Sequence, residues 1–206
     1  WDSVGPYSNN GLMTFDPKNP NSMTVLSREN PSLFRKENGT DTWHEYRNFP
    51  VLGGLPKTMV VDPTNKQNIY VPINSSGGWE DPTYIGKILA SKDGGKTWRT
   101  LPFPDIDISD LIIDESGQKL VAISNNEVYV SLDKGMNWEK LSGWWPYLND
   151  AELVNNDLYL SAGIQGVYVL KDVFSGSATS QELFQPSGIS TKDILGNQDI
   201  LNASTF

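Results

Sequence analysis

Acidic residues in two loop-like segments are the first side chains in this sequence whose types and spacing could do chemistry. Glu80 and Asp81 stand in SSGGWEDPTYIG, and Asp105 and Asp107 stand in PFPDIDIS. Hydrolysis of a glycosidic bond uses two carboxyl groups about 5 to 10 Å apart, one as the acid and one as the base or nucleophile. These four residues are therefore candidate catalytic groups, with Asp150 as a further carboxylate of the same kind. The alternative is that they are acidic loop residues that only face solvent.

Aromatic residues accompany these acids and could bind a ligand. They are Trp79, Tyr84, Trp144, Trp145 and Tyr147. Exposed rings of this kind stack against the C–H faces of sugars or hold the side chains of a peptide. The alternative is that the tryptophans pack between neighbouring sheets. Because adjacent residues of an extended chain point to opposite sides, the two adjacent tryptophans are hard to bury together.

Composition excludes several other kinds of chemistry. The chain of 206 residues has no cysteine, so neither a disulfide nor a thiolate metal site can form. We find no phosphate-binding loop, no G-x-S-x-G motif and no cluster of metal ligands. The single histidine, His44, is expected on an outer strand and therefore at the surface. The net charge of −9 opposes binding to nucleic acid or to an anionic membrane. No run approaches about 18 apolar residues, so we expect no membrane insertion, no cofactor and no metal.

A motif that occurs twice indicates the architecture. The octapeptide SKDGGKTW at 91–98 returns as SLDKGMNW at 131–138. The shared positions are Ser91 and Ser131, Asp93 and Asp133, Gly95 and Gly135, and Trp98 and Trp138, with Asn137 in the place of Thr97. An active site normally needs a motif once, whereas repetition at a fixed period is typical of a repeat architecture.

Turn chemistry explains the repeated residues without a catalytic role. The glycine can take a positive φ, the aspartate can accept backbone N–H groups inside the turn, and the tryptophan can fold back as an apolar plug. A tight hairpin between two strands meets all of these requirements. Asp93 and Asp133 as acids or calcium ligands are the functional alternative. We interpret the octapeptide as a structural turn.

Short apolar runs around the octapeptides predict four strands in each repeat. Expected first strands are 13–15, 58–61, 110–113, 152–154 and 193–195, and expected second strands are 23–27, 68–74, 119–124, 157–162 and 199–204. Expected third strands are 32–36, 87–91, 127–131 and 166–170, and a fourth strand begins at each closing tryptophan. Asp, Asn, Gly and Pro residues separate first from second strands. Units of four antiparallel strands every 40 to 55 residues or so have the period of a β-propeller blade.

The predicted fold class is therefore all-β, a β-propeller of four-stranded antiparallel blades. Blades are expected at about residues 5–46, 55–101, 108–141 and 150–184, with a partial blade at 192–206 and residues 1–4 as an outer strand. Because the chain begins in mid-repeat and stops after a second strand, we expect a portion of a larger propeller; a closed ring of five blades is the alternative. The cut blade is expected to need the remainder of a longer chain, or a neighbouring strand that pairs along 200–203.

The octapeptides resemble the Asp-box, also called the BNR or sialidase-type repeat, with the pattern Ser-x-Asp-x-Gly-x-Thr-Trp. Residues 91–98 match this pattern fully, residues 131–138 match it with Asn137 in the threonine place, and FRKENGTDTW, ending at Trp43, is similar to a degenerate copy. Turns such as DPKNPNS add a likeness to sialidases, propeller xyloglucanases and sortilin-type receptors. The resemblance spans essentially the whole chain and indicates fold rather than function.

The resemblance implies that ligands bind opposite the Asp-boxes. In such propellers the third-to-fourth and first-to-second turns share one rim, and the remaining loops share the other. The candidate acids and aromatic residues all fall on that other rim, and segment 75–86 is its conspicuous insertion. A sialidase is disfavoured, because that family uses three arginines and an Arg-Ile-Pro stretch, whereas this chain has only Arg28, Arg35, Arg47 and Arg99.

We therefore expect a non-catalytic or weakly catalytic extracellular recognition module, secreted or at the cell surface, that binds a glycan or a protein. The alternatives are a glycoside hydrolase of the Asp-box propeller type and a receptor or assembly protein of the sortilin type. The acidic, asparagine-rich and cysteine-free composition fits an extracellular location. Three sequons, at Asn38, Asn74 and Asn202, permit N-glycosylation.

Overall fold

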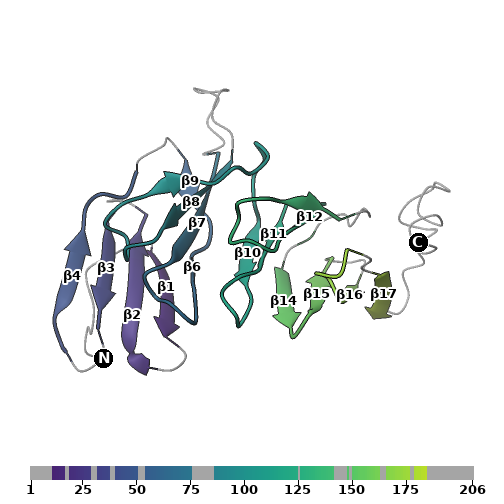
Figure 1. Ribbon diagram of the computed structural model, residues 1–206, viewed down its shortest axis with the longest axis horizontal. Helices are drawn as coiled ribbons and strands as arrows, with labels where there is room; N and C mark the ends of the chain where they lie inside the picture. Colours follow the sequence, from purple (N-terminus) through teal and green to yellow (C-terminus); the bar gives the residue numbers. More distant parts are fainter. Residues whose placement is uncertain are drawn as a thin grey trace.

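The computed structural model describes residues 11–16, 19–28, 32–37, 40–50, 54–75, 86–124, 126–141, 148, 150–162, 166–176 and 179–184. Every regular element within these ranges is a β-strand, and the strands form four antiparallel sheets that follow one another in a row (Figure 1). We call these sheets blades 1 to 4 in chain order. The described part contains no helix that could span a membrane. The all-β fold class predicted from the sequence is confirmed.

Each blade is an antiparallel meander in which strands close in sequence pair with one another. Blade 1 consists of β1 (Gly11–Asp16), β2 (Asn19–Ser27), β3 (Leu33–Lys36) and β4 (Trp43–Tyr46). Blade 2 consists of β5 (Leu55–Pro56), β6 (Val60–Val61), β7 (Ile69–Asn74), β8 (Lys87–Ser91) and β9 (Arg99–Thr100). Blade 3 consists of β10 (Asp110–Ile113), β11 (Leu120–Ile123), β12 (Val128–Ser131) and β13 (Glu139–Lys140). Blade 4 consists of β14 (Asp150–Val154), β15 (Asp157–Ser161), β16 (Val167–Lys171) and β17 (Thr179–Phe184).

The first strand of blade 2 differs from the prediction. Instead of one strand at 58–61, β6 is shorter, and β5 pairs separately with the far end of β7. Pro72 lies in β7 between the two pairings and has no N–H to donate, so the ladder is interrupted at that point. The predicted partial blade, 192–206 with residues 1–4, lies outside the described residues.

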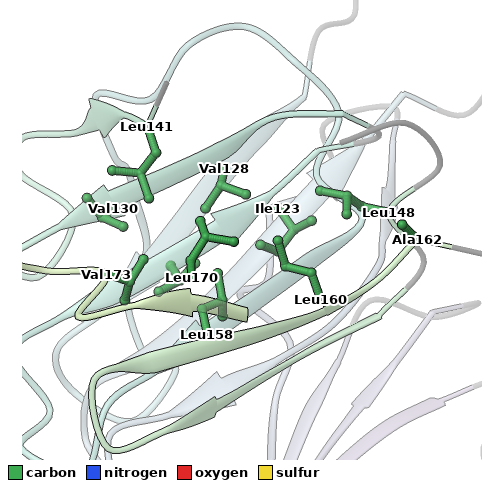
Figure 2. Packing of buried hydrophobic residues seen from close by; sticks show 11 residues of the cluster. Ile123, Val128, Val130, Leu141, Leu148, Leu158, Leu160, Ala162, Leu170 and Val173 are labelled. Carbon is green, nitrogen blue, oxygen red and sulfur yellow. The ribbon is translucent and has the colours of Figure 1, made fainter. Parts of the chain in front are cut away.

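The hydrophobic cores lie between neighbouring blades. Figure 2 shows the cluster between blades 3 and 4, where Val128 and Val130 of β12 lie with Leu158 and Leu160 of β15. Equivalent clusters join blade 1 to blade 2 and blade 2 to blade 3. Each blade is therefore stabilised mainly by the blades beside it, as expected for a repeat architecture.

Alternation along the second strand explains how one strand serves two cores. In β7, Ile69 and Val71 pack in the cluster shared with blade 1, and Tyr70 packs in the cluster shared with blade 3. Successive side chains of a strand point to opposite faces. A strand covered on both faces is therefore apolar throughout rather than at alternate positions. The same reason explains why all four residues of β11 are buried.

Candidate functional site

The first octapeptide forms a tight turn between β8 and β9. The Ser91 hydroxyl accepts the Gly95 N–H at 2.8 Å, and the Asp93 carboxylate accepts the Thr97 N–H at 2.8 Å and the Thr97 hydroxyl at 2.6 Å. Gly95 has a φ of 93°, and its carbonyl accepts the indole N–H of Trp98 at 3.1 Å. All five residues therefore serve the turn itself.

The second octapeptide forms the same turn between β12 and β13. The Asp133 carboxylate accepts the Asn137 N–H at 2.8 Å and the Asn137 side-chain amide at 2.6 Å, so asparagine replaces threonine without loss of either contact. Gly135 has a φ of 79° and accepts the indole N–H of Trp138 at 3.1 Å. Donors on Thr97 lower the pKa of Asp93 to about 2, and donors on Asn137 lower the pKa of Asp133.

Replacing Asp93 with alanine is expected to lower the free energy of unfolding by about 1 kcal/mol, because the N–H and hydroxyl donors of Thr97 lose their acceptor. The pKa of Asp93 falls from 3.8 to about 2 on folding. Its stabilisation is therefore fully present above pH 4 and is lost as the pH falls through about 2. Urea unfolding at pH 7 and pH 2 measures both effects, with Asp133→Ala as the matched variant. A loss of the same size at both pH values would contradict this account.

The octapeptide turns share one end of the blades with the first-to-second turns. Gly94 N–H donates to the Gln67 carbonyl and Lys134 N–H donates to the Gln118 carbonyl, each at 2.9 Å. We call this end, formed by residues 62–68, 91–98, 114–119 and 131–138, the turn rim. Asp62 is buried there and accepts from the Lys134 ammonium of the next blade at 3.3 Å. The turn rim is therefore tied together by contacts within and between blades.

A cavity of about 210 Å³ lies on the turn rim between blade 1 and the turn at 62–66 of blade 2. Its lining includes Arg35, which is 4% exposed, and Lys66. Arg35 is paired with Glu37 at 3.3 Å, and Lys66 is paired with Asp16 at 3.4 Å. Because these charges neutralise one another, we interpret the cavity as a polar contact region between two blades and not as a ligand site.

The opposite end of the blades carries the predicted site. We call this end, formed by residues 74–75, 86, 102–110, 148 and 150, the loop rim. The Asn74 amide donates to the Ile108 carbonyl at 2.7 Å and accepts the Ile108 N–H at 3.0 Å. The Ser75 N–H and hydroxyl donate to the Asp107 carboxylate at 2.8 and 2.6 Å. Ser75, which directly follows β7, is therefore held against the between-blade loop.

Gly86, which directly precedes β8, lies against the same between-blade loop. A Cβ atom on Gly86 would lie 2.1 Å from the Ile106 carbonyl oxygen, so only glycine permits this approach of two backbones. Residues 74–75 and Gly86, on either side of segment 76–85, thus both meet residues 106–108 of the between-blade loop. The Asn74 amide that a glycan would modify is used in this contact.

The structure places some of the predicted site residues and not others. Asp105 is exposed, and Asp107 holds Ser75 as described above. The remaining candidates lie outside the described residues: Glu80, Asp81, Trp79, Tyr84, Trp144, Trp145, Tyr147, Asn38 and Asn202. His44 is exposed on β4, as predicted. The described ranges contain no group of three or more His, Asp or Glu side chains that could hold a metal ion.

Asp110 is a candidate that the sequence reasoning did not select. It begins β10 at the loop rim, as Asp150 begins β14 in the next blade. Burial raises the pKa of Asp110 to about 6; the Leu111 N–H opposes this rise, and the charges of Asp150 and Glu152 add to it. A carboxyl group with this pKa can donate a proton near neutral pH. The sequence did contain a signal for this residue, because an aspartate is the first residue of the first strand in two successive blades.

Solved structures with the same arrangement of blades identify the fold. The chain is similar to a GH74 enzyme from Niastella koreensis, with a TM-score of 0.56 and 19% identity over 82% of this chain and 29% of that one. It is similar to the chain in a nidogen/laminin complex, with a TM-score of 0.62 and 16% identity over 85% of this chain and 65% of that one. A third is YCF48 bound to D1 peptide, with a TM-score of 0.57 and 15% identity over 86% of this chain and 54% of that one.

The fold is a β-propeller. At these identities the likeness shows the fold alone. The chain spans less than a third of the length of the GH74 enzymes that it matches. No protein-family model and no curated protein matches the sequence.

Proposed function

We propose that this propeller is an extracellular recognition module, secreted or at the cell surface, that binds a glycan or a protein on its loop rim. The observation that supports this proposal is that residues 74–75 and Gly86, which flank segment 76–85, both contact residues 106–108. A loop fixed at both ends loses less conformational freedom when it binds a ligand. The turn-rim carboxylates, by contrast, are used within their own turns.

We also infer that the two octapeptides are Asp-boxes and that the chain is a portion of a larger propeller. The geometry of two turns with the same hydrogen bonds and a positive φ at the glycine supports the first inference. The second is supported by the coverage of less than a third of the similar GH74 chains. In this arrangement the ligand contacts the face opposite the boxes. The stacking residues in the proposal are Trp79, Tyr84, Trp144, Trp145 and Tyr147.

The similar structures include propellers solved with partners, namely the nidogen/laminin complex and YCF48 with D1 peptide. They support a protein or peptide as one of the two ligand classes in the proposal. The similar GH74 enzymes, one of which is a xyloglucanase, support a carbohydrate as the other ligand class in the proposal.

Titration with a panel of oligosaccharides and extended peptides tests the proposal. We expect saturable binding without release of reducing ends, weakened at least tenfold in Trp79→Ala and Trp144→Ala, because each variant loses a stacking surface. Trp43→Ala is the matched control, since Trp43 begins β4 at the far end from the loop rim and should leave binding unchanged. An equal loss in all three variants, or no binding to either class, would refute the proposal.

A glycoside hydrolase is the second candidate, and the raised pKa of Asp110 favours it. A carboxyl group whose pKa is raised to about 6 stays protonated up to a higher pH than an ordinary aspartate, as the acid of such a reaction needs, and Asp150 from the next blade would be the base. Asp107 is a poorer choice, because its carboxylate already accepts two hydrogen bonds from Ser75. Release of reducing ends that disappears in Asp110→Asn and persists in Asp107→Asn would establish the hydrolase instead of the recognition module.

A further inference from the structure

A methionine in the second octapeptide turn contacts a charged side chain of the preceding blade. Met136 is 43% exposed. Its sulfur accepts N–H groups from both terminal nitrogens of Arg99, Nη1 and Nη2, each at 3.3 Å. Because Arg99 belongs to β9 of blade 2, this contact joins blades 2 and 3 at the turn rim. A thioether sulfur is only a weak acceptor, so the contact stabilises the fold little in this form.

Arg99 has no stronger acceptor in the described part of the chain. The residue is half-buried, and its Nε atom is buried without a hydrogen-bond partner among the described residues. None of the ion pairs within the described ranges includes Arg99. Hydrogen bonds from a charged donor are strong when the acceptor is an oxygen atom. An oxygen atom on the Met136 sulfur would therefore be a much better partner than the sulfur itself.

Neither the turn nor the core explains a methionine at this position. The turn uses the backbone of residue 136, whose N–H donates to the Asp133 carboxylate at 3.0 Å. In the first octapeptide the same position is Lys96, which also serves the turn aspartate through its backbone. Met136 belongs to none of the three hydrophobic clusters between blades. The distinctive feature of this side chain is therefore an exposed sulfur beside a guanidinium.

We propose that Met136 is an oxidation site and that Arg99 binds its sulfoxide, so that reaction with a peroxide strengthens the contact between blades 2 and 3. In this reaction the sulfur lone pair attacks one oxygen of hydrogen peroxide, and an S–O bond forms as the O–O bond breaks. The other oxygen leaves as hydroxide and takes the proton of the transferred oxygen, which gives water. The thioether is thereby oxidised and the peroxide reduced. Methionine sulfoxide reductases reverse the modification.

The new oxygen can reach the guanidinium while the turn keeps its backbone contacts. A methionine side chain is unbranched and flexible, and Met136 is exposed, so its sulfur can draw back toward solvent and place the oxygen against Arg99. Both terminal nitrogens of Arg99 already donate in this direction. Oxidation of methionine usually disrupts the surroundings of the side chain. At Met136 the expected effect on stability has the opposite sign.

Peptide mapping after treatment with dilute hydrogen peroxide tests whether Met136 is an oxidation site. Exposed methionines are the ones that a peroxide in solution can reach. We therefore expect sulfoxide at Met136 and at Met13, which is 59% exposed, before it forms at Met59, which is 7% exposed. If Met136 is still a thioether when Met13 is fully oxidised, the proposal is wrong.

Thermal melting before and after the same treatment tests the role of Arg99. Met136→Leu is the matched reference, because it undergoes every other oxidation and lacks only this sulfur. Relative to this reference, oxidation should raise the melting temperature of the unmodified protein by about 3 °C, as one added charged hydrogen bond would in a chain of this size. Circular dichroism establishes that each variant is folded.

Arg99→Leu retains an apolar stem and has no side-chain N–H donor. Compared in the same way with the double variant Arg99→Leu, Met136→Leu, it should show no rise on oxidation, because the sulfoxide then has no guanidinium to bind. A rise of the same size in Arg99→Leu would mean that another group binds the sulfoxide, and the proposal would fail. No rise in the unmodified protein, with sulfoxide present at Met136, overturns it as well.

Discussion

Replacing Gly95 with alanine is expected to lower the free energy of unfolding by about 3 kcal/mol. Its φ of 93° lies in a region that costs a residue with a side chain about 1 to 2 kcal/mol. The added methyl group would lie 2.1 Å from Cδ2 of Leu33, which is fully buried in the cluster between blades 1 and 2. Overpacking of this kind costs about 1 to 3 kcal/mol more. The turn of blade 2 is thereby coupled to the core that it shares with blade 1.

Gly176→Ala separates the two contributions. Gly176 has a φ of 72°, but no atom lies within 4 Å of the position that its Cβ would occupy. This variant should therefore show the backbone cost alone, about 1 kcal/mol. Urea denaturation of the two variants and the unmodified protein gives both values. If the losses are the same, the contact with Leu33 contributes nothing and the proposed coupling is absent.

The strands of this protein could be predicted because local sequence determines them. The octapeptides place a glycine where φ is positive and an aspartate where N–H groups need an acceptor, so each turn is specified within eight residues. The apolar runs of β7 and β11 marked strands buried on both faces. Periodicity then ordered these strands into blades. The ladder of β6 was misjudged, because the effect of Pro72 acts across the sheet and not along it. The fourth strands β9 and β13 begin one residue after the tryptophans that were expected to start them.

The candidate site could be predicted only in part, because its contacts join residues far apart in the sequence. Asp107 was recognised as an acid, but its role in holding Ser75 depends on a loop 32 residues away. Gly86 gave no signal, since the carbonyl that excludes a side chain belongs to Ile106 of the next between-blade loop. Asp110 was read as a strand residue because desolvation, which raises its pKa, follows from packing that no local pattern reports.

The two rims have different physical roles, and the placement of charge explains why. On the turn rim, buried charges such as Asp62 and Arg35 have partners in the same blade or the next, so they join the blades. On the loop rim, Asp110 is partly buried, the negative charges of Asp150 and Glu152 raise its pKa further, and the positive charge of Lys57 opposes them least of all the named causes. A group in this position is costly to ionise in the folded protein. Such groups are typical of sites that act on ligands rather than of sites that stabilise a fold.

Replacing Asp110 with asparagine is expected to stabilise the protein at pH 8 by about 2 kcal/mol and to leave it unchanged at pH 4. The pKa of Asp110 is 3.8 in its ordinary state and about 6 in the folded protein. Between these values the folded protein holds a proton that the unfolded chain has lost, so stability falls as the pH rises from about 4 to 6. A rise of about two units at roughly 1.4 kcal/mol each sets an upper value of about 3 kcal/mol. Solvent screening at this half-buried position reduces the expected effect to about 2 kcal/mol.

Asparagine is the suitable replacement because its side-chain oxygen can still accept the Leu111 N–H, which Asp110 accepts at 2.8 Å. Asp105→Asn is the matched control, since it removes the same charge from an exposed position of the preceding loop. Urea unfolding of both variants and the unmodified protein at intervals from pH 4 to pH 8 gives the difference in stability directly. The curve for Asp110→Asn should separate from the unmodified protein near pH 4 and level off above pH 6, where Asp110 is ionised in both states. A difference that is constant with pH, or the same as that of Asp105→Asn, would show that Asp110 ionises normally, and the hydrolase candidate would then lose its acid.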